Sequence, residues 1–349
     1  MSKAAQLAAL IGSGQAQGNR NTIINGAMNA AQRGTSSTGL GAAAGYFTCD
    51  RWKMDFGSTA GRLTMTQTAD GPSGFANCIK LDCTTADTSI AAGEYGVLVQ
   101  RLEGQDLQKF MKGTSDAKSY TVSFYVKGNA SATYILELID RDNSRSVSKT
   151  FSVTTSWSRV ELTFPADTTG AFNDDNAVSL DLQWWFHSGS TYNSGTLQQT
   201  WAGTTAANRA AGGDSFFDST NRTFFMTGVQ LEIGDVATPF EHEDIGTTLR
   251  KCQRYYTRWQ STGANNWPRF FQPSYVDNGY VSGTFSFPVQ MRTHPSVAVT
   301  GTWQGQGADG IGTGSVSQDG VTLFCQSVGA ASIAGYYADG GSLDMASEL

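Results

Sequence analysis

The segment 181–190, DLQWWFHSGS, gathers an acid, an amide, an imidazole and three aromatic rings. Successive side chains of a β-strand point to opposite faces of its sheet. The odd-numbered residues from Asp181 to His187 should therefore share one face, and the even-numbered residues from Leu182 to Phe186 the other. The even-numbered set is entirely apolar and should face a core, whereas the odd-numbered set is chemically mixed.

Such a mixed face has the composition that sugar binding requires. The C–H groups of a sugar ring stack on flat aromatic faces, and planar polar side chains bond the hydroxyls. We therefore take Trp185 and His187 as candidate glycan-binding residues. The competing hypothesis is that a neighbouring strand or another subunit covers this face and leaves His187 hydrogen-bonded and inert.

Three further rings are candidates for the same role. Tyr192 and Trp201 follow in the segment SGSTYNSGTLQQTWAG, and loops on rigid β scaffolds often carry recognition. We therefore expect Trp201 to be better exposed than Trp185, although a loop tryptophan can also pin its loop to its own domain. Trp303 stands beside the glycine-rich segment 304–310. The alternative for Trp303 is packing between subunits.

Catalysis is not expected. A glycosidase needs two carboxyl groups roughly 5 to 10 Å apart, and four carboxylates could meet on one sheet face: Asp181, Glu137, Asp140 and Glu161. Carboxylates on strand surfaces are common, however, and the sequence contains no GxSxG motif. We therefore predict no catalytic residues and no enzyme.

No cofactor is predicted, and calcium is the one metal that the sequence leaves open. Calcium takes hard oxygen ligands, and Asp174 and Asp175 form an acidic pair in a polar loop. Asp50 and Glu232 are further candidates. For Glu232, which ends the last strand of the large domain, we favour a structural role, bonding the amides that turn the chain into ATPFE.

Composition excludes several classes of protein. Only 15% of the 349 residues are charged, against about 25% in typical domains. The net charge is −6 and the basic residues are scattered, so we expect no nucleic-acid partner. No apolar run approaches the roughly 18 residues of a membrane-spanning helix, so we expect no membrane insertion.

The five cysteines form no CxxC pair, and no histidine stands at metal spacing from them. Neither a disulfide framework nor a zinc site is supported. We predict mostly buried free thiols in a chain made in a reducing cytoplasm.

Residues alternate between apolar and polar in nine segments separated by turn signals. The segments are 62–69, 77–85, 94–103, 119–128, 132–141, 146–154, 157–165, 178–186 and 222–234. A first strand is expected at 46–54 after a glycine-rich loop at 34–45, and a helical turn near Gln105. Many evenly spaced antiparallel strands indicate an all-β sandwich or jelly roll.

The segment 244–260 interrupts this pattern as a helical connector, and strands resume at 269–276, 279–291, 296–303, 320–328 and 333–339. The glycine-rich segment 304–315 between them should be a flexible loop. We therefore predict a short N-terminal helix for attachment (1–20), a jelly-roll β-sandwich (21–243), the connector (244–260) and a smaller C-terminal β-domain (261–349).

Several phrases follow one another in a specific order. They are NTIINGAMNAAQRGTS (21–36), YFTCDRWKM (46–54), GEYGVLVQRLEG (93–104), KSYTVSFYVKG (118–128), FPADTTG (164–170), the long segment 222–258 and the tail YYADGGSLDMASEL (336–349). In this order they resemble the tail-fibre and related receptor-binding proteins of tailed bacteriophages. The resemblance covers nearly the whole chain up to Arg258 and is looser beyond it.

This resemblance implies a homotrimeric virion protein of the phage tail, with a jelly roll similar to carbohydrate-binding modules and without a shared catalytic signature. Its expected partners are other tail or baseplate proteins and a host cell-surface polysaccharide, to which it would attach the phage. The alternative is a structural virion component of the collar, baseplate or capsid, with a role in assembly.

Overall fold

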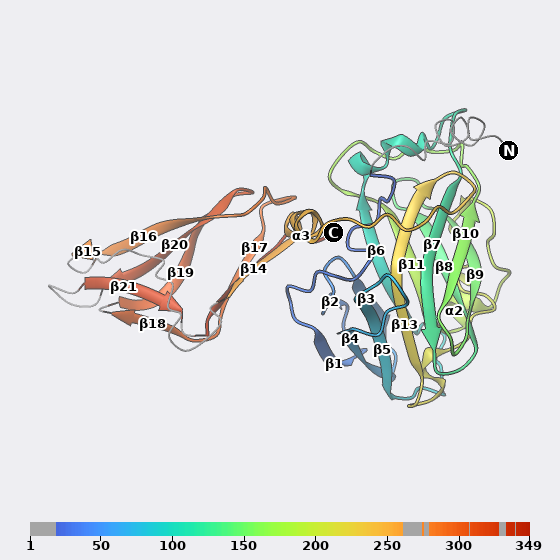
Figure 1. Ribbon diagram of the computed structural model, residues 1–349, viewed down its shortest axis with the longest axis horizontal. Helices are drawn as coiled ribbons and strands as arrows, with labels where there is room; N and C mark the ends of the chain where they lie inside the picture. Colours follow the sequence, from blue (N-terminus) through green and yellow to red (C-terminus); the bar gives the residue numbers. More distant parts are fainter. Residues whose placement is uncertain (1–18, 261–273, 276–278, 307, 328–332, 339) are drawn as a thin grey trace. The chain divides into compact units, whose positions relative to one another are not determined.

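The computed structural model describes residues 19–260, 274–275, 279–306, 308–327, 333–338 and 340–349 (Figure 1). The expected N-terminal helix lies almost wholly outside the described residues. The chain divides into two compact units, Met1–Thr248 with Leu349, and Leu249–Glu348. Both are built from antiparallel strands, so the predicted all-β class is confirmed.

The first unit is a jelly-roll β-sandwich, as predicted. Its six-stranded sheet has the order β1 (Ser36–Leu40), β4 (Arg62–Thr68), β5 (Cys78–Thr85), β13 (Thr223–Ile233), β7 (Tyr120–Gly128) and β10 (Ser158–Phe164). Its seven-stranded sheet has the order β12 (Ala202–Gly203), β9 (Arg145–Val153), β8 (Ala132–Asp140), β11 (Val178–Ser188), β6 (Tyr95–Glu103), β3 (Lys53–Gly57) and β2 (Gly45–Tyr46). Figure 1 shows the two layers, with β11 and β6 central in the second sheet.

The core between the sheets is strongly aromatic. Trp184 of β11 is fully buried, and its ring lies 5.4 Å from that of Trp52 and 5.8 Å from that of Phe124, measured between centroids. Leu182 and Phe186 belong to the same core. The prediction that the even-numbered residues of β11 face the interior is therefore confirmed.

All nine strands predicted from the alternating segments exist, with ends within two residues of those expected. The structure differs from the prediction at two places before these nine strands. β1 occupies part of the expected loop at 34–45, because it pairs with β4. The single strand expected at 46–54 is divided into β2 and β3, and Arg51 between them adopts a left-handed backbone with φ 73°.

Short helical turns complete the first unit. They are η1 (Gly104–Asp106), η2 (Gln108–Phe110), α2 (Ser190–Asn193), η3 (Ala206–Asn208) and η4 (Phe216–Asp218). The first two confirm the predicted helical turn near Gln105. No helix among the described residues is long and apolar enough to cross a membrane.

The described residues of the second unit form three small antiparallel sheets. They comprise β14 (Tyr256–Gln260), β22 (Ser342–Ala346) and β17 (Ser296–Thr300); β15 (Ser274–Tyr275), β21 (Ile333–Ala338) and β18 (Trp303–Gln306); and β16 (Tyr280–Ser286), β20 (Gly320–Ser327) and β19 (Ala308–Val316). Helix α3 (Ile245–Gln253) precedes them in the chain. The expected helical connector is therefore shorter than 244–260, because its last residues form β14.

The prediction of a flexible loop at 304–315 is wrong, because most of this segment forms β19 and the end of β18. Its glycines suit a strand here because Gly312 pairs with Phe324. A Cβ atom on Gly312 would lie 2.6 Å from Cζ of that ring. The missing side chain thus makes room for the phenylalanine.

Candidate functional site

A small cleft lies on the seven-stranded sheet, on the face away from the core. Its volume is about 180 Å³, and it is lined by Asp55, Tyr95, Val97, Arg141, Gln183, Trp185, Tyr192 and Arg209. Strands β3, β6 and β11 supply its floor, whereas α2 and the segments after β8 and η3 supply its walls. Two of the five predicted glycan-binding residues, Trp185 and Tyr192, therefore come together in it.

Three aromatic rings form the apolar part of the cleft. The centroid of the Tyr192 ring lies 5.4 Å from that of Trp185 and 5.5 Å from that of Tyr95. The guanidinium of Arg209 lies over the Trp185 ring, 4.7 Å from its centroid. Trp185 is only 3% exposed, so it serves as the floor beneath Tyr192 and Arg209.

Arg209 is held in place by buried acceptors. Its Nε donates to both carboxylate oxygens of Glu137, at 3.1 and 3.0 Å, and its Nη2 donates to Oε1 of Gln183 at 3.0 Å. Nε1 of Trp185 donates to the same carboxylate at 2.9 Å. Burial raises the pKa of Glu137, and the guanidinium of Arg209 opposes that rise. The arginine is thus fixed before any ligand arrives.

A second charged group borders the cleft at Asp181, which is fully buried. Arg141 donates to Oδ2 of Asp181 through Nε at 2.9 Å and also through Nη2. Arg101 approaches Oδ1 of the same carboxylate at 3.5 Å. The side chain of Arg141 remains 39% exposed, so it presents N–H groups to solvent at the cleft wall.

Asp55 and Tyr95 complete the lining of the cleft. The Tyr95 hydroxyl donates to Oδ1 of Asp55 at 3.4 Å, and Nζ of Lys53 lies 3.7 Å from Oδ2. Burial raises the pKa of Tyr95, and the neighbouring carboxylate of Asp55 raises it further. The tyrosine therefore stays protonated and can donate a hydrogen bond near neutral pH.

His187 does not lie on the outer face, contrary to expectation. The pairing of β11 with β6 slips by one residue between Trp185, which pairs with Val97, and His187, which pairs with Gly96. This bulge reverses the alternation. The imidazole therefore packs against Phe217 of the main core, with ring centroids 5.3 Å apart. Burial lowers its pKa, although nearby carboxylates raise it.

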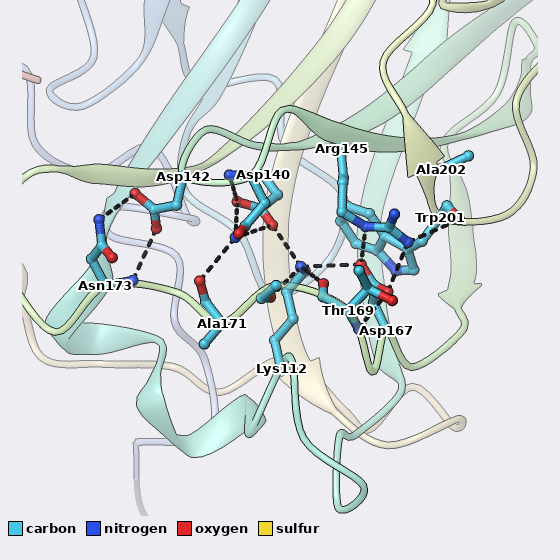
Figure 2. Close-up of polar contacts among 12 residues, drawn as sticks. Lys112, Asp140, Asp142, Arg145, Asp167, Thr169, Ala171, Asn173, Trp201 and Ala202 are labelled. Carbon is cyan, nitrogen blue, oxygen red and sulfur yellow. Dashed lines mark hydrogen bonds and ion pairs between the residues drawn. The ribbon is translucent and has the colours of Figure 1, made fainter.

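Trp201 is buried in the main core at 9% exposure, against 3% for Trp185, so it is the more exposed of the two rings but does not stand open to a ligand. Its Nε1 donates to the carbonyl of Pro165 at 2.9 Å, and its ring lies 6.2 Å from that of Tyr120. Figure 2 shows it beside a network of charged residues that includes Lys112, whose Nζ is 5.4 Å from the ring centroid. Although Trp201 stands in a loop, its ring packs into the core, because burial of a large aromatic side chain is favourable.

Trp303 belongs to the second unit. Its ring is 6.1 Å from that of Trp259, and its Nε1 donates to the carbonyl of Thr300 at 2.8 Å. It is partly buried against the small core of that unit. Its role in glycan binding stays a prediction.

Among the described residues, no group of three or more possible metal ligands includes a candidate calcium ligand. Asp174 and Asp175 are exposed, and Oδ1 of Asp175 accepts the N–H of Ala177 at 2.9 Å. Glu232 has the predicted structural role, since its carboxylate accepts the N–H of Thr238 at 2.9 Å and the hydroxyl of that residue at 2.8 Å.

Sequence reasoning missed several residues of the cleft. Tyr95 and Val97 stand two residues apart in β6 and so share a face, but nothing local showed that β6 lies beside β11. Arg141 and Arg209 stand in connecting segments, and their partners Asp181 and Glu137 are 40 and 72 residues away. A sequence pattern could not have found these pairs.

No protein-family model matches this chain, and no curated protein matches it either. Among solved structures it is similar to the enzymatically active domain of tailspike protein 4 of bacteriophage CBA120, with TM-score 0.31 and 10% identity. That match covers 62% of this chain and only 22% of the tailspike chain.

Carbohydrate-binding modules are also similar. The TmCBM61 module in complex with β-1,4-galactotriose has TM-score 0.33 and 9% identity, covering 62% of this chain and 100% of the module. The family 11 module from Clostridium thermocellum, in complex with a β-1,3-1,4-mixed-linked tetrasaccharide, has TM-score 0.28 and 11% identity, covering 60% and 98%. At these identities the similarity is limited to the fold.

Proposed function

We propose that this chain is a phage tail fibre, a receptor-binding protein that attaches the virion to a glycan on the bacterial surface through the cleft on the seven-stranded sheet. The observation that carries the proposal is the convergence of Tyr95, Tyr192 and Arg141 with fixed polar partners in one open cleft. The ordered sequence phrases that resemble phage tail fibres support the same function.

The chemistry of the cleft suits a sugar. The tyrosine rings offer apolar surface to the C–H groups of a pyranose. Arg141 offers N–H donors, and Asp55 offers acceptor oxygens for hydroxyl groups. A volume of about 180 Å³ is below the roughly 300 to 1,000 Å³ of drug-sized ligand sites. The cleft therefore suits a single terminal or branching sugar of a longer polysaccharide.

We propose a binding role without catalysis. The buried carboxylates nearest the cleft, Glu137 and Asp181, are each engaged by a guanidinium. A general acid must deliver its proton to the leaving-group oxygen of a substrate. Carboxylates that accept bonds from arginine and face away from solvent are poorly placed for that step.

The proposed protein acts as a homotrimer in the virion tail, after synthesis in the host cytoplasm, and binds other tail or baseplate proteins. Sedimentation of the purified protein should give a mass three times the 37.2 kDa of the chain. A monomer at micromolar concentration would contradict the trimer without affecting the cleft.

A structural virion role is the second candidate, and one observation favours it. Trp185, His187 and Trp201, which sequence reasoning offered as surface residues, are all covered by the chain itself. The aromatic surface left open is therefore smaller than in the sequence-based interpretation. A protein that binds no cells yet is required for particle assembly would support this role.

The test is adsorption of purified protein to host cells and to polysaccharide extracted from them. Arg141→Ala should weaken binding about tenfold or more, because a hydrogen bond to a charged group contributes about 1.5 to 3 kcal/mol. Tyr192→Ala should also weaken binding, because it removes a ring on which the sugar stacks. Lys80→Ala is the matched control, since Lys80 lies on the six-stranded sheet and pairs with Asp82 at 2.8 Å.

Normal adsorption by both cleft variants would show that the cleft does not bind the glycan. Release of reducing sugar from the polysaccharide would establish an enzyme instead.

A further inference from the structure

We infer that Asp87, Glu94 and His187 form a binding site for a divalent first-row transition cation such as Zn²⁺ at one end of the β-sandwich. One ligand atom from each of the three lies within 4.8 Å of the others, and all three residues are buried. Nε2 of His187 lies 3.5 Å from Oε2 of Glu94 and 4.0 Å from Oδ2 of Asp87.

Two atoms of this group lie opposite each other but do not form a hydrogen bond. His187 is 1% exposed, and neither its Nε2 nor Oε2 of Glu94 has a hydrogen-bond partner among the described residues. Leaving such buried polar atoms unpaired destabilises the folded protein. Their separation of 3.5 Å is too long for a good N–H to O bond. It is close to the roughly 3.3 Å between ligands of a tetrahedral zinc with bonds of about 2.0 to 2.1 Å.

The remaining atoms of the group are already oriented. Nδ1 of His187 lies 2.8 Å from Oγ of Ser215, and that oxygen accepts the N–H of Phe217 at 3.1 Å. The Oγ has a second lone pair, so Nδ1–H can donate to it, which leaves the lone pair of Nε2 free for a metal. Metal-binding histidines are usually held in this way by a partner on the other nitrogen.

Asp87 is oriented in the same manner. Its Oδ2 accepts the hydroxyl of Thr59 at 2.8 Å and the N–H of Ala60 at 2.9 Å. These bonds fix the carboxylate in a position facing the imidazole. Second contacts of this kind hold ligating carboxylates in metal sites.

The donor set selects the kind of cation. One imidazole nitrogen with two carboxylate oxygens suits Zn²⁺ and its first-row neighbours, whereas Ca²⁺ and Mg²⁺ prefer oxygen alone. Three protein ligands leave one position of a tetrahedral shell for water. The cation would join the end of β11 to the connection between β5 and β6, and so fix segments that are about 100 residues apart in the chain.

The test is Zn²⁺ binding by the full chain without an affinity tag, after treatment with a chelator and dialysis. Calorimetry should show one Zn²⁺ per chain, and Zn²⁺ should raise the melting temperature and protect residues 87–94 and 187–193 from hydrogen exchange. Co²⁺ should give the visible absorption of a four-coordinate site. Wild-type protein suffices for these readings, so they do not depend on the folding of a variant.

Variants then locate the site. His187→Gln and Glu94→Gln should abolish the stoichiometric uptake, and Ser215→Ala should weaken it about 10- to 100-fold. His242→Gln and His294→Gln remove the other two histidines of the chain and should bind Zn²⁺ as the wild type does.

The inference is overturned if the wild type takes up no more Zn²⁺ than His187→Gln, or if a control histidine carries the binding. In either case the three residues are a buried polar cluster and not a metal site.

Discussion

At the residue scale, Lys112 is a charged side chain that the first unit buries completely. Its Nζ lies 2.5 Å from Oδ2 of Asp140 and 3.0 Å from Oδ2 of Asp167. It also donates to the carbonyls of Thr169 at 2.9 Å and Gly170 at 2.7 Å. Figure 2 shows the oxygens of Asp140, Asp167 and Thr169 around the ammonium. The positive charge of Lys112 thus compensates the negative charge of the buried carboxylates around it.

Lys112→Met should therefore destabilise the first unit by about 3 to 5 kcal/mol, because removal of the ammonium leaves the buried carboxylate of Asp140 without its cation. Native-state hydrogen exchange of β7, β8 and β11 measures this free energy of unfolding. The control is Lys127→Met, whose partly exposed pair with Asp70 should contribute about 1 kcal/mol or less. Equal effects of the two variants would contradict the role given to Lys112.

Asp167 makes this network sensitive to acid. Burial raises its pKa, but hydrogen bonds from Arg145 and Lys112 outweigh burial, and its pKa lies below the ordinary 3.8. Such a group adds stability above its unfolded pKa and loses it as the pH falls through the folded value. The free energy of unfolding should therefore fall below about pH 4.

Asp167→Asn should show a shallower fall over the same range, because the side chain no longer titrates. Hydrogen exchange of the first unit between pH 5 and the acid limit measures both slopes. Identical slopes for the two proteins would show that other carboxylates govern the acid sensitivity.

At the scale of elements, the turn from β6 into η1 brings two backbone segments so close that no side chain fits between them. Gly104 lies where β6 ends and η1 begins, and a Cβ atom there would stand 2.0 Å from the carbonyl oxygen of Asn173 and 2.5 Å from Oγ of Ser179. The backbone oxygen cannot move without disturbing the segment that leads into β11. Only glycine fits at this junction.

Gly104→Ala should destabilise the first unit by about 1 to 3 kcal/mol through overpacking. Gly203→Ala, in β12, is the matched control, because a Cβ atom there meets no atom within 4 Å. The control should be neutral or slightly stabilising. Exchange protection of β6 and β11 provides the measurement, and a Gly104 variant as stable as the control would refute the steric account.

At the scale of the whole molecule, each unit has a core of its own. The first core spans both sheets of the sandwich, and the second is a smaller cluster that includes Met291, Leu323 and Leu343. All five cysteines are buried within one unit or the other, as predicted. The fold therefore protects every thiol of the chain.

A thiol reagent should consequently react with none of the five cysteines of the native protein at neutral pH, and with all five after unfolding. Burial raises the pKa of Cys78 to about 12 and of Cys83 to about 11, and it raises that of Cys49 as well. Timed labelling with and without denaturant, read by mass spectrometry, gives the number modified. Rapid labelling of a native cysteine would show that its unit opens readily.

The sequence by itself determined the strands of the sandwich and its aromatic core. Alternation and turn residues are local properties, so β4 to β11 and β13 could be placed within two residues, and Trp184 and Phe186 could be assigned to the interior. Local composition failed at 304–315, because the glycines there accommodate a ring from the paired strand and do not loosen the chain.

Only the tertiary structure decided which polar and aromatic side chains meet. The bulge in β11 carried His187 away from Trp185 and toward Asp87 and Glu94, and packing buried Trp201 while leaving Tyr192 at the cleft. Arg209 reached Glu137 across 72 residues. These outcomes depend on strand register and on long-range packing, and neither property is encoded in the residues next to each position.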